Sequence, residues 1–249
     1  MKKLKEIFIA ILIIAITGYL TLSVYRAQSS RANRELAKRI AELSPKGGPP
    51  ETIDGLRRAI ALYEDQIERN VREGAQTGVY WKILATRLAD RNMHNDALNA
   101  LERAIYYNTE DPVLYYLTGV SAANAAKSIV GFSANANRER EGYFRLSENS
   151  YKRALELDVT YTRPMYGLAI LYVFELDRPQ DAIFHLERLL QIIPSDNSAM
   201  FVLARAYFMT ENLQKASEIY SRIAERTRDK SLKEEALYNR DIIQGMLHE

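Results

Sequence analysis

The chain has 249 residues, 47% of them hydrophobic, which is enough to build a sizeable core and excludes a disordered tail. Its 34 basic residues are scattered and nearly matched by 32 acidic ones, so a surface that follows nucleic-acid phosphates is not expected. The absence of cysteine excludes disulfides, thiolate metal sites, cysteine nucleophiles and a lipoprotein-type lipid anchor.

The first 25 residues predict a single transmembrane helix. Three lysines precede an uncharged run at residues 7–24. As a helix this run is about 27 Å long, close to the ~30 Å hydrocarbon core of a bilayer. A retained anchor is favoured, and the alternatives are a cleaved signal peptide and a buried helix of a soluble protein.

Basic residues flank both ends of this run, so the positive-inside count is nearly balanced. The short basic tail favours an N-terminus inside the cell. The expected location is therefore the inner (cytoplasmic) membrane, with the C-terminal domain periplasmic or extracytoplasmic.

Residues 26–50 predict a stalk followed by a Gly/Pro linker. The stretch "SPKGGPP" at residues 44–50 holds two glycines and three prolines and cannot continue a helix. Beyond it, apolar residues recur at spacings of three and four, which is typical of amphipathic helices. We expect an all-α fold, in which residues 51–77 form an N-terminal capping helix or a degenerate half repeat.

The rest of the chain repeats with a period of 34 residues. Ala182 and Ala216 are separated by this distance, as are Leu186 and Tyr220. Two related stretches, residues 96–108 and 181–193, are 85 residues apart, which is two periods plus an insertion. Read as antiparallel helix pairs, the pattern predicts four repeats over residues 78–228, an insertion near residues 125–141 and a C-terminal capping helix at residues 229–249.

Small residues stand where the paired helices are expected to cross. Gly119 and Ala169 on first helices, and Ala97 and Ala182 on second helices, would let the backbones approach closely. In the C-terminal helix, Ser231 and Glu234 have the spacing of a capping box.

The pattern resembles the tetratricopeptide repeat, with Trp81, Tyr115, Met165 and Met200 at the position of the first signature aromatic. Two of the four are methionine instead of an aromatic residue, but two exact 34-residue offsets support the resemblance. The resemblance implies an α-solenoid in which each pair shelters its apolar face against the next.

In this family the concave side of the array, formed by first helices, binds proteins. Lys82 and Arg163 also match two positions of the family's clamp for chaperone C-terminal tails, but the remaining clamp positions differ, so this ligand is not expected. An alternative is that the capping helix or the insertion folds over the groove and makes it ordinary core. The predicted protein-binding groove consists of Lys82, Tyr116, Val120, Arg163, Tyr166, Ile170, Phe174, Phe201, Arg205, Phe208 and Met209.

The insertion at residues 125–141 contains one apolar stretch, residues 129–132, followed by the charges "RERE". The simpler interpretation is that it extends the helices on either side of a turn. The alternative is a lip that contacts a specific partner.

The sequence offers no catalytic constellation. None of the three histidines is paired with another ligand type in a metal-binding array, and neither a nucleophile elbow, a Walker loop nor a dinucleotide fingerprint is present. We therefore predict no enzyme activity, no cofactor, no metal and no catalytic residue.

The expected function is that of a membrane-anchored scaffold that binds partner proteins in the bacterial cell envelope. It resembles the accessory or assembly factors of secretion, cytochrome maturation, pilus and flagellar systems. The alternatives are a structural subunit that self-associates as a homo-oligomer, and the same scaffold facing the cytoplasm.

Overall fold

The computed structural model describes residues 34–39, 41–42 and 52–247. The predicted anchor at residues 1–25 and the Gly/Pro linker at residues 44–50 lie outside the described residues. The described part of the predicted stalk, residues 34–39 and 41–42, is helical. Within the described ranges, no helix combines the length and the apolar character that a bilayer crossing requires.

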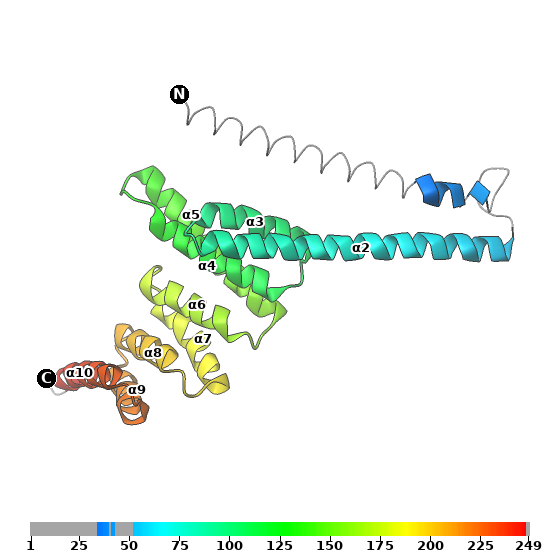
Figure 1. Cartoon of the computed structure of the whole chain (residues 1–249). Helices are drawn as coiled ribbons and strands as arrows, with labels where there is room; N and C mark the ends of the chain where they lie inside the picture. Colours follow the sequence, from blue (N-terminus) through cyan, green and yellow to red (C-terminus); the bar gives the residue numbers. More distant parts are fainter. Residues whose placement is uncertain (1–33, 40, 43–51, 248–249) are drawn as a thin grey trace, which may run out of the picture. The chain divides into compact units, whose positions relative to one another are not determined.

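Residues 52–247 fold into helices joined by short turns, without a strand, which confirms the predicted all-α class. The chain divides into two compact units, residues 1–73 and residues 74–249, and the repeats lie in the second. The helices, labelled in Figure 1, are α2 (Ile53–Ala89), α3 (His94–Tyr107), α4 (Pro112–Ser128), α5 (Ala134–Leu157), α6 (Thr162–Phe174), α7 (Pro179–Ile192), α8 (Asn197–Met209), α9 (Leu213–Arg226) and α10 (Lys230–Leu247).

Helix α2 differs from the predicted organisation. It runs without interruption from Ile53 to Ala89, across the expected boundary between residues 77 and 78. Residues 53–77 are therefore continuous with the first helix of the first repeat. No proline interrupts this segment, and an isolated glycine such as Gly74 costs a helix only about 1 kcal/mol. The other domain boundaries stay predictions.

The helix pairs α4 with α5, α6 with α7 and α8 with α9 follow one another through the second unit (Figure 1). Three of the turns inside pairs carry a residue with positive φ: Asn92, Asp177 and Glu211. These positions are separated by 85 and 34 residues, so the backbone repeats at the spacing predicted from the side chains. The predicted helix-turn-helix solenoid is confirmed.

Small residues make the helix crossings close, as predicted. Ala97, Ala169 and Ala182 are fully buried. At the α4–α5 crossing, the buried Ser147 hydroxyl donates a hydrogen bond of 2.8 Å to the carbonyl of Gly119. Such contacts are possible only where no larger side chain separates the two backbones.

Side chains fix where several helices begin. Pro112 opens α4, and the Asp111 carboxylate accepts a hydrogen bond of 2.9 Å from the Val113 N–H. The predicted capping box at Ser231 is wrong, because α10 begins one residue earlier. Asp229 caps it instead, and its carboxylate accepts from the N–H of Ser231 at 2.9 Å.

The insertion lengthens both helices of the second repeat. Helix α4 has 17 residues and α5 has 24, joined by residues 129–133. The simpler interpretation of the insertion is therefore correct for most of its length. At the tip, Val130 and Phe132 are 94% and 93% exposed, so they contribute nothing to the core.

Candidate protein-binding groove

A groove of about 220 Å³ lies between the first helices α4 and α6. Five of its lining residues belong to the predicted groove: Tyr116, Val120, Arg163, Tyr166 and Ile170. The residues that line it come only from α4, α5, α6 and Glu175 just after α6, so neither α10 nor the tip of the insertion covers it. The complete set of lining residues is Tyr116, Val120, Ala123, Asn124, Lys127, Tyr151, Arg163, Tyr166, Gly167, Ile170, Leu171 and Glu175.

Tyr151 of α5 forms the floor of this groove. Its ring fills the space beside two glycines of the first helices: a Cβ at Gly119 would lie 2.6 Å from Tyr151 Cδ1, and one at Gly167 would lie 2.7 Å from Tyr151 Cζ. Both separations are too short for real atoms, so both positions require glycine while the tyrosine is present. The Tyr151 ring can form the floor of the groove because Gly119 and Gly167 have no side chains.

Sequence reasoning missed Tyr151, since it assigned the groove to first helices only. The pair Gly119 and Gly167 was the available signal. Each leaves a first helix without a side chain at a point where a larger second-helix residue can enter.

The groove is rich in tyrosine. The Tyr116 ring lies 6.2 Å from the Tyr151 ring and 5.5 Å from the Tyr161 ring, measured between centroids. Burial raises the pKa of Tyr151 and of Tyr166, so their hydroxyls stay protonated at neutral pH. The site therefore offers aromatic faces together with neutral hydrogen-bond donors.

Charged residues stand at the groove's edges. Lys127 and Glu175 form an ion pair of 3.1 Å between α4 and the end of α6. Arg163, by contrast, takes part in no ion pair within 4 Å among the described residues. The groove thus has one neutralised pair and one cation without a carboxylate partner.

The remaining predicted residues do not line this groove. Lys82 is held by an ion pair of 2.8 Å with Asp111. The Arg205 guanidinium lies 4.9 Å from the centre of the Phe174 ring, which links α8 to α6. Phe201 packs edge-on against Tyr220, with 5.7 Å between ring centroids.

Phe208 is 38% exposed, and Met209 is partly buried against the core. The two are on α8 and, like the other α8 positions, stay predictions as binding residues.

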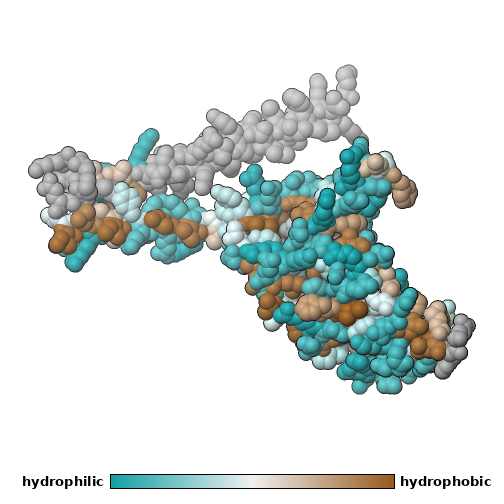
Figure 2. Space-filling model, turned by 180° about the vertical axis from the view of Figure 1, so that it is seen from behind, coloured by the Kyte–Doolittle hydropathy of each residue, from teal (hydrophilic) through white to brown (hydrophobic). Residues whose placement is uncertain are grey.

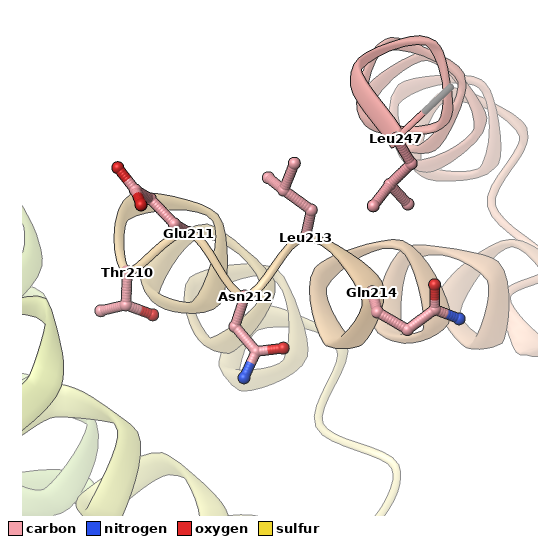
Figure 3. Close-up of a pocket in the computed structure, with 6 residues that line it drawn as sticks. All are labelled: Thr210, Glu211, Asn212, Leu213, Gln214 and Leu247. Atoms are coloured by element: carbon pink, nitrogen blue, oxygen red, sulfur yellow. The ribbon is translucent and has the colours of Figure 1, made fainter. Parts of the chain in front are cut away.

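A second hollow lies at the turn between α8 and α9. Its lining is Thr210, Glu211, Asn212, Leu213, Gln214 and Leu247, with Leu213 and Leu247 directed toward one another across it (Figure 3). None of the predicted groove residues is among them. Four of the six are polar residues, so this hollow lacks the aromatic lining of the α4–α6 groove.

A polar cluster joins α5, α6 and α7 outside the groove. Glu148 accepts hydrogen bonds from Lys152 at 2.7 Å, Tyr172 at 3.0 Å and Arg178 at 3.1 Å. Burial opposes its ionisation, but these donors outweigh burial and hold the Glu148 pKa below its ordinary value. A carboxylate with three donors stabilises the packing of successive repeats.

The two described histidines, His94 and His185, show no metal-binding arrangement. Among residues 34–39, 41–42 and 52–247, no three His, Asp or Glu side chains gather closely enough to hold a metal ion. Burial and the nearby Lys152 lower the pKa of His185, whose ring stacks on Tyr172 at 6.1 Å. His94 opens α3, and its buried Nδ1 has no hydrogen-bond partner in the described part of the chain.

Successive antiparallel helix pairs with an exposed groove on their first helices define an α-solenoid of helix-turn-helix repeats. Residues 173–235 match the family model described as "Tetratricopeptide repeat". Together with the 34-residue period and the stacked pairs, this match shows that the chain contains repeats of the tetratricopeptide kind. Arrays of this kind are protein-interaction scaffolds.

Known proteins share the repeats at low identity. The chain is 28% identical over 142 residues to "Anaphase-promoting complex subunit 3" of Schizosaccharomyces pombe, a match that covers 57% of the chain but only 19% of that relative.

Two solved structures show the same fold. One is "YrrB: a TPR protein with an unusual peptide-binding site", with a TM-score of 0.55 and 17% identity over 73% of this chain and 83% of that one. The other is a thermophilic TPR protein of Thermus thermophilus, with a TM-score of 0.53 and 18% identity over 73% of this chain and 88% of that one.

Proposed function

We propose that this chain is a membrane-anchored scaffold of the bacterial cell envelope that binds a partner protein through the α4–α6 groove. The observation that carries the proposal is the open groove itself, which is lined by Tyr116, Tyr151 and Tyr166 and is not covered by the tip of the insertion or by α10. The apolar run at residues 7–24 supports membrane anchoring. An anchored scaffold of this kind suits an accessory or assembly role in an envelope machine.

The groove's size and charge suit a short extended segment of a partner. At about 220 Å³ it is below the range of about 300–1,000 Å³ for pockets that enclose a drug-sized molecule. A single aromatic or branched side chain can enter it against Tyr151. Arg163 then favours an acidic group next to that side chain, because no carboxylate within 4 Å satisfies it among the described residues.

The related fold lends support of a general kind. YrrB is described as having a peptide-binding site, which agrees with a peptide ligand here.

The experiment places a photo-crosslinking residue at Tyr166, in the groove, and in a second variant at Phe184, an exposed aromatic on α7 outside the groove. We expect capture of one partner from Tyr166 alone. Arg163→Glu should reduce that capture at least tenfold, whereas Arg145→Glu, at an exposed arginine of α5, should not. Equal capture from both positions, or capture that Arg163→Glu leaves unchanged, would reject the groove as the binding site.

Membrane attachment and orientation are tested separately. With the C-terminal domain outside the cytoplasm, a reporter fused after Glu249 that is active only there gives signal, and a cytoplasm-only reporter does not. The opposite pattern favours the scaffold facing the cytoplasm. Release of the chain from membranes by carbonate would exclude an integral anchor.

A further inference from the structure

An apolar row on the N-terminal part of α2 has no partner within the described structure. Six large side chains in residues 53–71 are between 41% and 71% exposed. Figure 2 shows brown, apolar side chains following one another along this part of the helix. The row consists of Ile53, Leu56, Ile60, Tyr63, Ile67 and Val71.

The row has the spacing of a coiled-coil seam. Ile53, Ile60 and Ile67 are seven residues apart and take the a positions of successive heptads. Leu56, Tyr63 and Asn70 take the d positions of the three heptads. Isoleucine at a with leucine at d, as in the first heptad, favours a parallel two-stranded coiled coil. This pattern is narrower than the broad apolar face of a helix that packs onto a globular core.

The charged side chains on the opposite face of this segment form ion pairs with one another. Arg72 pairs with Glu68 at 2.8 Å, and Arg69 pairs with Asp65 one turn earlier. These pairs lie four residues apart along the helix and need no external partner. The polar face therefore belongs in water, and the apolar row is the side that remains to be covered.

The seam ends at Gly74, the first residue of the second unit. Gly74 holds the next a position, and a Cβ there would lie 3.8 Å from Tyr107 Cδ1 of α3. From this point the same side of α2 faces α3. The exposed row is thus confined to about three heptads, all of them in residues 53–73.

We propose that this row is a dimerisation seam whose occupant is the same row of a second copy, aligned parallel and in register. An identical row is self-complementary about a two-fold axis, as a C2 interface requires. In this register Ala59 at g faces Glu64 at e of the second copy, and Gln66 at g faces Val71 at e. No like charges meet across the seam. The proposal is independent of the groove and would stand if the groove bound nothing.

The absence of native cysteine makes the test direct. Full-length chains carrying Ile53→Cys, Ile60→Cys or Ile67→Cys are oxidised mildly in the cells that express them and separated on non-reducing gels. A disulfide requires Cα atoms about 4.4–6.8 Å apart, so a parallel seam joins each variant to its own copy. Arg58→Cys and Ala61→Cys, at outward f and b positions, are the matched controls.

We expect a covalent dimer from each of the three isoleucine positions and at least tenfold less from the two controls. An antiparallel pair would join Ile53→Cys to Ile67→Cys in mixed samples but neither to itself, which would overturn the parallel register. Uniform crosslinking at all five positions, or none at any, would overturn the seam. In the last case the row is covered by a segment of the same chain or by another protein.

A second measurement does not depend on disulfides. Ile60→Asn with Ile67→Asn should change the mass of the full chain by light scattering from two copies to one, with helicity by circular dichroism retained. A mass that stays at two copies in this variant would place the contact elsewhere.

Discussion

Replacing Gly119 by alanine tests whether Tyr151 shapes the groove. The new Cβ would lie 2.6 Å from Tyr151 Cδ1 and Cε1 and 3.0 Å from Cγ, all atoms of a rigid ring that is only 4% exposed. Alanine gains about 1 kcal/mol over glycine in helix propensity. Relieving the clash must move the ring or separate α4 from α5, which costs typically ~1–3 kcal/mol and more when the backbone shifts.

A backbone shift here also stretches the Ser147 hydrogen bond to the Gly119 carbonyl, worth about 1 kcal/mol. We therefore expect Gly119→Ala to lower the free energy of unfolding by about 1–2 kcal/mol net. For a domain of this size that corresponds to a fall in Tm of roughly 2–8 °C. Gly167→Ala should cost less, because its Cβ meets the outer end of the ring at Cζ and Oη.

Urea unfolding followed by far-ultraviolet circular dichroism measures these differences. Gly142→Ala is the matched control: this glycine is also helical, but nothing lies within 4 Å of its Cβ position. It should gain about 0.5–1 kcal/mol.

In a Tyr151→Leu background, Gly119→Ala should become neutral or stabilising, with a coupling energy of at least ~1 kcal/mol. If Gly119→Ala stabilises the protein as much as Gly142→Ala does, the close approach to Tyr151 is not real.

Three further outcomes follow from the structure. Asp111→Ala removes both the cap of α4 and the Lys82 ion pair and should lower the free energy of unfolding, measured by thermal unfolding, by about 1–2 kcal/mol. Asp111→Asn should cost less because it keeps the cap, and equal losses in the two variants would contradict this. The pKa of Glu148 is lowered in the folded state, so this carboxylate stabilises the fold fully above the ordinary carboxyl pKa, and the stabilisation is lost as the pH falls through the folded pKa. Glu148→Gln should therefore flatten the curve of unfolding free energy against pH in that acidic range and leave the slope of the curve at neutral pH unchanged. Replacing Val130 and Phe132 together by alanine should change stability by less than ~0.5 kcal/mol, since both are almost fully exposed, and a larger loss would mean that the tip packs against something.

The repeat architecture could be predicted because the period is local information. Ala182, Ala216 and their neighbours mark the same crossing in successive pairs, and each pair is nearly self-contained in sequence. The turns obey the same spacing at Asn92, Asp177 and Glu211, although the third side chain is longer than the first two. A short polar residue in the first two and a glutamate in the third show that the backbone position, more than the residue type, repeats.

The groove was only partly predictable because its floor depends on contacts between distant residues. The resemblance to the tetratricopeptide repeat places Tyr116, Val120, Tyr166 and Ile170 on one side of the array, and the structure brings them together. The repeat pattern does not reveal that Tyr151 of α5 reaches between two first helices. This arrangement requires two glycines 48 residues apart to face the same side chain. The repeat period sets a boundary near residue 77, but α2 continues across that position, and its local sequence holds no proline that would end the helix there.

The insertion contributes to the groove through its helical part. A standard repeat has no counterpart for the end of α4, where Lys127 lies, and the ion pair of Lys127 with Glu175 stands at the edge of the groove. The exposed tip at Val130 and Phe132 is not among the lining residues. The two interpretations of the insertion therefore apply to different parts of it: its first residues extend α4 to border the groove, and only its tip is free to act as a lip.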